Sequence, residues 1–275
     1  MILKSVVLVS GIQGLLSEIF KLMNLQEISV TVLTKNSQKY LNEVLNALSA
    51  FGEVLLFDNG STDNTLEIAK KYSNVTLIQD TFKGFGRTHN EASSAAKNDW
   101  ILSIDHDEIV TPELINTLSH ETLDPKTIYS ISNHNYFNGK WIKGCGWYPD
   151  RKFRLYHRGH TQFTDAQVHE SIMTSGLKTR ALNGPIIHYS YESISDFLQK
   201  MQIYSTLFAE QNCGKKSSSL GAAILHGLSA FIKSYVIKRG FLDGAEGFII
   251  SAYNGHTAYY KYLKLLEANS RAQRS

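Results

Sequence analysis

The chain has 275 residues, of which 43% are hydrophobic and 19% are charged, and these fractions exclude a disordered protein. Its 28 Lys and Arg residues against 25 Asp and Glu residues leave a net charge of +3, too small by itself to indicate a nucleic-acid-binding protein. Two cysteines are too few for a disulfide framework, so a cytoplasmic protein is expected.

Residues 1–26 are expected to form an N-terminal extension. The apolar stretch Ser5–Leu16 is about half as long as the roughly 20 residues that span a bilayer. No transmembrane helix is predicted anywhere in the chain. Because Met23 stands a few residues before the first predicted strand, we expect it to be the working start and residues 1–22 to be a frayed extension or a surface helix.

Residues 27–128 alternate between predicted strands and helices. The strands are expected over 28–33, 53–57, 75–79 and 100–104, and the helices over 40–50, 64–72 and 87–96. Asp63 is expected to cap the second helix. Four β-α repeats of this kind predict an α/β fold with a parallel, doubly wound sheet, whose ligands bind at the carboxyl ends of the strands.

Two carboxylates follow the fourth predicted strand. Asp105 and Asp107 flank His106 at the end of an apolar run, and at this spacing they can converge on Mg²⁺ or Mn²⁺. Such cations take one or two carboxylates together with substrate phosphates. The alternative is a solvated turn before a helix that begins at Thr111-Pro112-Glu113.

Other polar residues follow the first two strands. Thr34 and Asn36 end the first strand, and Asp58 and Asn59 end the second. A carboxylate at position 58 can accept a hydrogen bond from a uracil imide or a ribose hydroxyl. These four residues are therefore candidates for nucleotide binding.

The helix predicted over 87–96 begins with Arg87 and Asn90. Free N–H groups and a guanidinium at a helix start favour phosphate, so both residues are also candidates for nucleotide binding. The alternative for Arg87 is a surface salt bridge.

Residues 28–114 resemble the glycosyltransferase family 2 domain with a GT-A fold, through the segments ISVTVLTKN, VLLFDNGSTDNT, FGRTHNEA and DWILSIDHDEIVTPEL. The resemblance implies that Asp58 contacts uracil, that Asp105 touches the ribose and that Asp107 binds the metal. It also implies an inverting reaction, in which a carboxylate deprotonates an acceptor hydroxyl that displaces UDP from the anomeric carbon.

The catalytic base is expected in residues 129–193, where short antiparallel strands are predicted. Val168-His169-Glu170 resembles the sub-group of the family that builds lipopolysaccharide inner cores. We favour Glu170 as the base, with Asp165 next, and the alternative for Glu170 is a salt bridge to Arg154 or Arg158.

Two histidines are candidates for a third metal ligand beside Asp105 and Asp107. They are His169 and His188, and the alternative for each is a structural histidine. His188 is kept with Asp105 and Asp107 as the predicted metal site.

Aromatic and basic residues interleave over 136–160. Trp147, Arg151 and Arg154 are the candidates for binding an anionic saccharide acceptor, because aromatic rings stack on sugars and guanidinium groups pair with phosphate or carboxylate. Single-stranded nucleic acid and a small sheet with buried aromatic residues are the alternatives. The acidic edge nearby argues against nucleic acid.

Residues 194–275 are predicted to be helical, with a helix start or hinge at Lys215–Ser219. An apolar stripe runs from Leu220 to Val236, and residues 196–239 hold six basic and two acidic side chains, a net charge of +4. Such a helix can lie on an anionic leaflet. It can equally pack on the catalytic domain or on a partner subunit. The segments Gly240–Gly244 and Lys261–Leu265 resemble the tail of the lipopolysaccharide-core β-glucosyltransferases.

The sequence therefore predicts a metal-dependent, inverting glycosyltransferase with a UDP-hexose donor, expected to be UDP-glucose. Its expected acceptor is a lipid-linked lipopolysaccharide or lipooligosaccharide inner core at the cytoplasmic face of the bacterial inner membrane. The alternatives are a family 2 transferase for another glycan or a peptide, and a non-catalytic glycan- or membrane-binding protein of the same fold.

Overall fold

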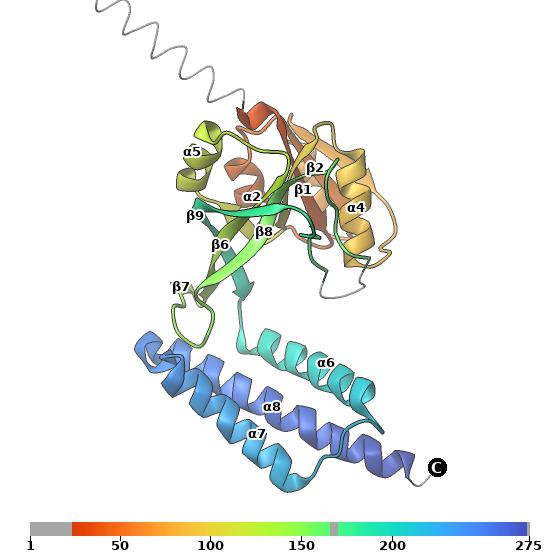
Figure 1. The fold of residues 1–275 in the computed structure, drawn as a ribbon, viewed down its shortest axis with the longest axis vertical. Coiled ribbons are helices and arrows are strands. Elements are labelled where there is room, and N and C mark those ends of the chain that lie inside the picture. Colours follow the sequence, from red (N-terminus) through yellow and green to blue (C-terminus); the bar gives the residue numbers. More distant parts are fainter. Residues whose placement is uncertain (1–23, 166–169, 274–275) are drawn as a thin grey trace, which may run out of the picture. The chain divides into compact units, whose positions relative to one another are not determined.

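The computed structural model describes residues 24–165 and 170–273 (Figure 1). The expected extension over 1–22 and the candidate ligand His169 lie outside the described residues. The chain forms two compact units. The first contains residues up to 133 together with 151–188, and the second contains residues 134–150 together with those from 189 onward.

The first unit is built on a parallel sheet. Its strands lie in the order β3-β2-β1-β4. They are β1 (Ile28–Thr34), β2 (Glu53–Asp58), β3 (Val75–Gln79) and β4 (Trp100–Asp105). Every residue of β1 and β2 is buried, as expected for parallel strands that are covered on both faces. The parallel α/β sheet predicted from the sequence is therefore confirmed.

Four helices accompany these strands: α2 (Leu41–Ala47), α3 (Thr65–Ala69), α4 (Phe85–Ala95) and α5 (Pro112–His120). Helix α5 begins at the point considered in the alternative for the acidic turn, with the Thr111 hydroxyl accepting from the Leu114 amide. Helix α3 is shorter than predicted. Asp63 precedes its N-cap residue, Asn64, and accepts from the Thr65 amide at 3.0 Å, so it supports the turn before the helix rather than capping it.

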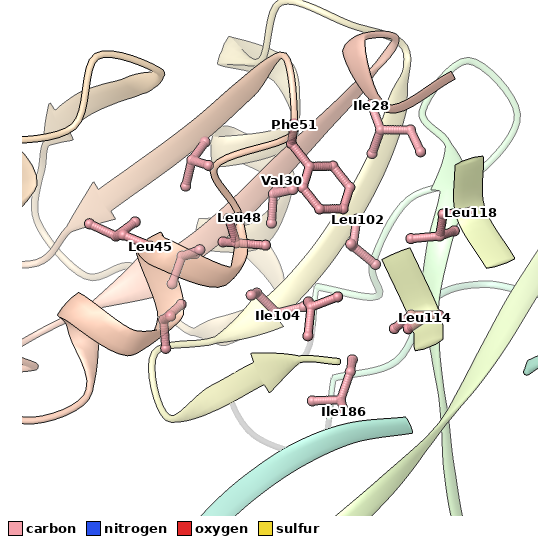
Figure 2. Close-up of a cluster of buried hydrophobic side chains, with 14 of the residues drawn as sticks. Ile28, Val30, Leu45, Leu48, Phe51, Leu102, Ile104, Leu114, Leu118 and Ile186 are labelled. Atoms are coloured by element: carbon pink, nitrogen blue, oxygen red, sulfur yellow. The ribbon is translucent and has the colours of Figure 1, made fainter. Parts of the chain in front are cut away.

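One hydrophobic core lies against the sheet of the first unit (Figure 2). It contains side chains from β1, from α2 and its C-cap residue, from β4 and α5, and from the later strand β9 (Lys178–Tyr191): Ile28, Val30, Leu45, Leu48, Leu102, Ile104, Leu114, Leu118 and Ile186. All of them are nearly or fully inaccessible to solvent. This core holds the strand ends that form the candidate site.

Beyond β4 the sheet becomes antiparallel, in the order β4-β8-β6-β9-β5. Its strands are β5 (Glu108–Val110), β6 (Thr127–Phe137), β8 (Asp150–His157) and β9 (Lys178–Tyr191). The predicted antiparallel strands after residue 128 are thus present. The short β7 (Lys140–Trp141), in the second unit, pairs with the end of β6.

The second unit is mainly helical, as predicted. Its helices are α6 (Ile194–Asn212), α7 (Leu220–Ile232), the π-helical turn η1 (Lys233–Ile237), the 3₁₀ turn η2 (Gly240–Asp243) and α8 (Gly244–Ala272). Both α6 and α7 pack along α8. Ser219 caps α7, which confirms the helix start predicted at this point.

Among the described residues, one helix, Leu220–Ile237, is long and apolar enough to cross a membrane, judged by length and composition alone. The sequence pattern predicts an amphipathic stripe in this stretch and no transmembrane helix. Lys233 is the one charged residue among these 18, so the stretch is more apolar than the stripe suggested.

Two glycines with positive φ differ in the space around them. A Cβ would be strained by the backbone conformation at both, but only at Gly184 would it also collide with another element. Gly184 in β9 has φ of 82°, and a Cβ there would lie 2.3 Å from the Leu114 amide nitrogen of α5. Gly176 has φ of 76° and open space around it. We expect Gly176→Ala to lower the free energy of unfolding by about 1 kcal/mol and Gly184→Ala by about 1–3 kcal/mol more. Urea denaturation measures both, and equal losses would contradict the close approach.

Candidate active site

The carboxyl ends of three strands meet at one edge of the first unit's sheet. In the parallel register Thr34 lies opposite Asp58, and Leu33 lies opposite Asp105. Residues separated by as many as 72 positions in sequence, Leu33 and Asp105, are therefore neighbours at this edge. Ligands of open α/β sheets bind at such edges.

Asp58 is fully buried and shapes the loop that follows β2. Its carboxylate accepts from the amides of Gly60 at 3.1 Å and Ser61 at 3.0 Å, and also from the hydroxyls of Ser61 and Thr34. Protein donors thus occupy the carboxylate on both oxygens. Asn59 donates from its backbone to the Thr34 carbonyl, and its side chain donates to the Asp80 carbonyl at 3.2 Å.

Asn36 joins the loops that follow β1 and β2. Its backbone is left-handed, with φ of 53°. Its amide donates to the Ser61 hydroxyl at 2.9 Å, and its side-chain oxygen accepts from the Thr62 amide at 2.8 Å. The four candidates on these two loops therefore belong to one hydrogen-bonded edge, and their contact with a nucleotide stays a prediction.

Arg154 of β8 organises the acids at the end of β4. Its guanidinium pairs with Asp105 at 2.9 Å and with the fully buried Glu108. Glu108 also accepts from the side chain of Asn133 at 2.7 Å and from the Asp105 amide at 3.0 Å. The turn from Asp105 to Glu108 is thus held at both ends by one ion cluster, in which Arg154 and Glu108 are buried and Asp105 is 41% exposed.

The cluster fixes the charge of its members. Although partial burial would raise the pKa of Asp105, the Arg154 guanidinium holds that pKa well below its ordinary value. Burial would lower the pKa of Arg154, but Glu108 and Asp105 raise it above its ordinary value instead. Asp105 is therefore an anion at neutral pH, with Arg154 as its permanent counter-charge.

The Arg154 side chain is only 8% exposed, whereas acceptor binding is predicted for an exposed side chain at this position. Its neighbours are the strand-end acids and the Ser103 carbonyl. Direct acceptor binding by Arg154 does not fit this burial, and the physical reason is that Glu108, a buried anion, requires a buried cation.

Asp107 lies beside His188, and the binding of a metal by these two residues and Asp105 stays a prediction. The pairing of β5 with β9 sets Glu108 opposite His188, and the His188 Nε2 atom lies 3.6 Å from the Asp107 carboxylate. Burial would raise the pKa of Asp107, but the His188 ring lowers it below its ordinary value. Within residues 24–165 and 170–273, no three His, Cys, Asp or Glu side chains form a metal-binding group.

The two candidates on α4 have different surroundings. Arg87 is exposed and its Nε lies 3.4 Å from Glu91, which is the surface salt bridge considered as its alternative. The Asn90 side chain donates to the Phe163 carbonyl at 3.0 Å and accepts from the Phe163 amide at 2.8 Å. Asn90 therefore anchors a distant segment of chain, a role that the sequence analysis did not identify.

That segment leads to both candidate bases. Phe163 forms a β-bridge with Ile172, and the Thr164 amide donates to the Ser171 carbonyl at 2.9 Å. Asp165 directly follows Thr164, and Glu170 directly precedes Ser171. One small antiparallel pair therefore carries both carboxylates. Salt bridges from Arg154 or Arg158 are the alternative for Glu170. In the structure Arg154 pairs with Asp105 and Glu108, and Arg158 pairs with Asp99.

Phe163, at the start of this antiparallel pair, packs on a buried histidine. The His89 ring of α4 stacks on Phe163, with 4.4 Å between the ring centroids. Burial lowers the pKa of His89 to about 4, so the ring is neutral at neutral pH. The sequence analysis missed this residue, and its position after Arg87 at the start of α4 was the one available signal.

The family model for glycosyl transferase family 2 matches residues 29–177, more than half of the chain. The chain belongs to glycosyltransferase family 2. The parallel sheet and the antiparallel strands beside it form the GT-A fold that the sequence resemblance implied.

Relatives of this glycosyltransferase cover most of its length. An uncharacterized glycosyltransferase of Rickettsia typhi is 28% identical over 264 residues, which cover 90% of each chain. A lipopolysaccharide core biosynthesis glycosyltransferase of Rhizobium meliloti is 24% identical over 196 residues, covering 67% of this chain and 71% of the relative. The crystal structure of Staphylococcus aureus TarS with UDP-GlcNAc is 17% identical, covers 90% of this chain and 91% of that one, and gives a TM-score of 0.42.

The other acceptor candidates of the glycosyltransferase lie in different units. Arg151, in the first unit, donates to the carbonyls of Ser130 and Leu182, each at 2.8 Å. Trp147, in the second unit, stacks with Tyr191 and lines a pocket of about 330 Å³. Asn135, Asp150 and Ser190 contribute polar side chains to the same pocket. Acceptor binding by Trp147 and Arg151 stays a prediction.

The buried ion cluster predicts a large difference between two neighbouring arginines. Removing Arg154 leaves the Glu108 anion buried without its cation, so Arg154→Leu is expected to lower the free energy of unfolding by about 3–5 kcal/mol. Arg151→Leu is the matched control, and it is expected to cost about 1–2 kcal/mol for its lost hydrogen bonds. Urea denaturation compares them. An Arg154→Leu protein as stable as the Arg151→Leu protein would contradict a stabilising role for the ion cluster of Arg154, Glu108 and Asp105.

Proposed function

We propose that this enzyme transfers a hexose, expected to be glucose, from a UDP-sugar to the inner core of a lipopolysaccharide or lipooligosaccharide. The observation that carries the donor half is the meeting of Asp58, Asp105 and Asp107 at one edge of a family 2 sheet, with His188 beside Asp107. Thr34, Asn36 and Asn59 order the loops around this edge.

Asp107 and His188 are the residues that would hold a divalent cation. The Asp107 carboxylate suits Mg²⁺ or Mn²⁺, and the His188 imidazole favours the transition-metal ion Mn²⁺ of the two; such ions complete their coordination with substrate phosphates and water. Two protein ligands therefore suffice for this kind of site. When bound, the cation neutralises charge on the diphosphate leaving group. Asp105, already paired with Arg154, is better suited to the ribose.

The transfer step needs one general base from the chain. Glu170 is proposed to take the proton from an acceptor hydroxyl while the hydroxyl oxygen bonds to the anomeric carbon of the sugar. The bond between that carbon and the diphosphate oxygen breaks, its electron pair stays on UDP, and the configuration inverts. Asp165, on the same antiparallel pair, is the second candidate for this role.

The acceptor class is supported by the relative from Rhizobium meliloti, whose name assigns it to lipopolysaccharide core biosynthesis. A lipid-linked acceptor is reached at a membrane surface, so the enzyme is proposed to work peripherally at the cytoplasmic face of the inner membrane. A family 2 transferase for another glycan is the second candidate, since the donor edge is independent of the acceptor.

Calorimetry with UDP-glucose, UDP-galactose and UDP-N-acetylglucosamine, each with and without Mn²⁺, tests the donor half. One donor is expected to bind in a metal-dependent way. Asp107→Asn is expected to remove that dependence and weaken binding at least tenfold, because the lost carboxylate is a metal ligand. Asp99→Asn, at the opposite end of β4, is the control and should bind normally. Equal affinity of all three proteins, with or without EDTA, would reject the metal site.

The two candidate bases are separated by isosteric amides. Glu170→Gln is expected to lower the transfer rate at least 100-fold while the donor binds with unchanged affinity, because an amide cannot accept the proton. Asp165→Asn is the matched variant and should keep most of the activity. UDP release in the presence of inner-core oligosaccharide measures both. Full activity in Glu170→Gln would move the base to Asp165.

A further inference from the structure

We propose that α7, η1 and η2 of the second unit form a lipid-binding surface, which takes the acyl chains and headgroup phosphates of an anionic leaflet without crossing it. This inference deepens the membrane location given under the proposed function by naming its surface and its lipid chemistry. It rests on that proposal only for the acceptor. Its own support is in the side chains of the second unit.

Large hydrophobic side chains are exposed along the whole length of this surface. Its large hydrophobic side chains are between 46% and 71% exposed. They are Leu220, Ile224, Leu225, Leu228, Ile232, Val236, Ile237, Phe241 and Leu242. Five of them recur at intervals of four residues from position 220 to position 236, so they share one side of the helix. Exposing this many large apolar groups to water is unfavourable, and it indicates a surface that is covered in use.

An apolar groove opens on the same side chains. It has a volume of about 480 Å³ and lies between α7 and α8. Gly227 and Gly255 let the two helices approach closely, since a Cβ on Gly227 would lie 3.2 Å from the Gly255 carbonyl oxygen. Ile224 and Leu228 both line the groove and are about half exposed, so the groove continues the apolar surface. Its dimensions and chemistry suit acyl chains.

The charges at the η1–η2 end favour an anionic partner. Lys233, Lys238 and Arg239 are exposed, and among the residues that the structure describes none of them pairs with an acid. Asp243, the acid that follows, is buried and accepts from the Gly144 amide at 2.6 Å. A second copy of this surface would set like charges against each other. Lipid phosphates satisfy the same cations.

The surroundings of α7 favour a helix that lies in the interface. One side of α7 packs along α8, which carries Glu246, Lys261 and Lys264. The 18 residues of Leu220–Ile237 would rise about 27 Å as an α-helix, slightly less than the roughly 30 Å hydrocarbon core. Lys238 and Arg239 then stand between the apolar helix and the exposed Phe241 and Leu242. This mixture of apolar and basic side chains is typical of interfacial binding.

Vesicle flotation of the full chain tests the surface. The protein is expected to float with vesicles of phosphatidylglycerol and phosphatidylcholine, and much less with phosphatidylcholine alone. The triple variant Leu225→Glu, Ile237→Glu, Leu242→Glu changes exposed positions only and should stay in the soluble fraction. Ile203→Glu is the matched control, since Ile203 of α6 is 56% exposed and lies outside the surface. Unchanged flotation of the triple variant would overturn the proposal.

Charge and depth are measured separately. Replacing Lys233, Lys238 and Arg239 with Gln is expected to weaken binding to the anionic vesicles about 100-fold. Alkaline carbonate should release the bound protein, whereas resistance to release would indicate a spanning helix and overturn the interfacial mode. A dimer that the triple variant makes monomeric would assign the surface to a second copy instead.

The donor site gives an independent readout for these variants. UDP-sugar binding by the triple variant should equal that of the unchanged protein. Loss of vesicle binding with normal donor binding supports the lipid surface. Normal vesicle binding without donor binding in the unchanged protein contradicts the proposed function and leaves the lipid surface supported.

Discussion

The buried ion cluster of Arg154, Glu108 and Asp105 is the constraint on which the active edge depends. A buried carboxylate is costly unless a cation and hydrogen-bond donors surround it, and Glu108 has Arg154, Asn133 and the Asp105 amide. These partners come from β4, β6 and β8, which are distant in sequence. The turn after β4 is therefore held at both of its ends, and within it Asp107 lies 3.6 Å from the His188 ring.

The acids of the site have different partners and are therefore suited to different roles. Asp105 is held by a permanent counter-charge, whereas Asp107 faces a histidine that can share a cation with it. His89 lies close to this group but is neutral at neutral pH, so it adds no positive charge that would compete with a bound cation. It serves as a flat surface for Phe163, and Asn90 fixes the backbone of the same residue. The antiparallel pair that supports the candidate bases is thus anchored to α4.

Local sequence patterns were sufficient for the strands and for the acids at their ends, because buried parallel strands are continuous apolar runs that end in polar turns. They were insufficient for Arg154, Asn90 and Glu108. A basic residue among aromatic residues suggests a binding wall, and only the pairing of β4 with β8 reveals that Arg154 is buried. The apolar residues of α7 pose the same problem. Periodicity identifies the stripe, but the packing of α8 on the other side of the helix decides that the stripe is exposed.

A lipid-binding surface on the second unit would also ease the demand on acceptor recognition. The pocket around Trp147, at about 330 Å³, lies at the lower end of the range for ligand pockets. An enzyme held on the leaflet that carries its acceptor encounters that acceptor at a high effective concentration, so modest direct affinity is enough. Donor affinity gains nothing from the membrane, because nucleotide sugars are free in solution. In the proposed reaction the acidic edge would serve donor binding, and the exposed apolar and basic surface would serve access to the acceptor.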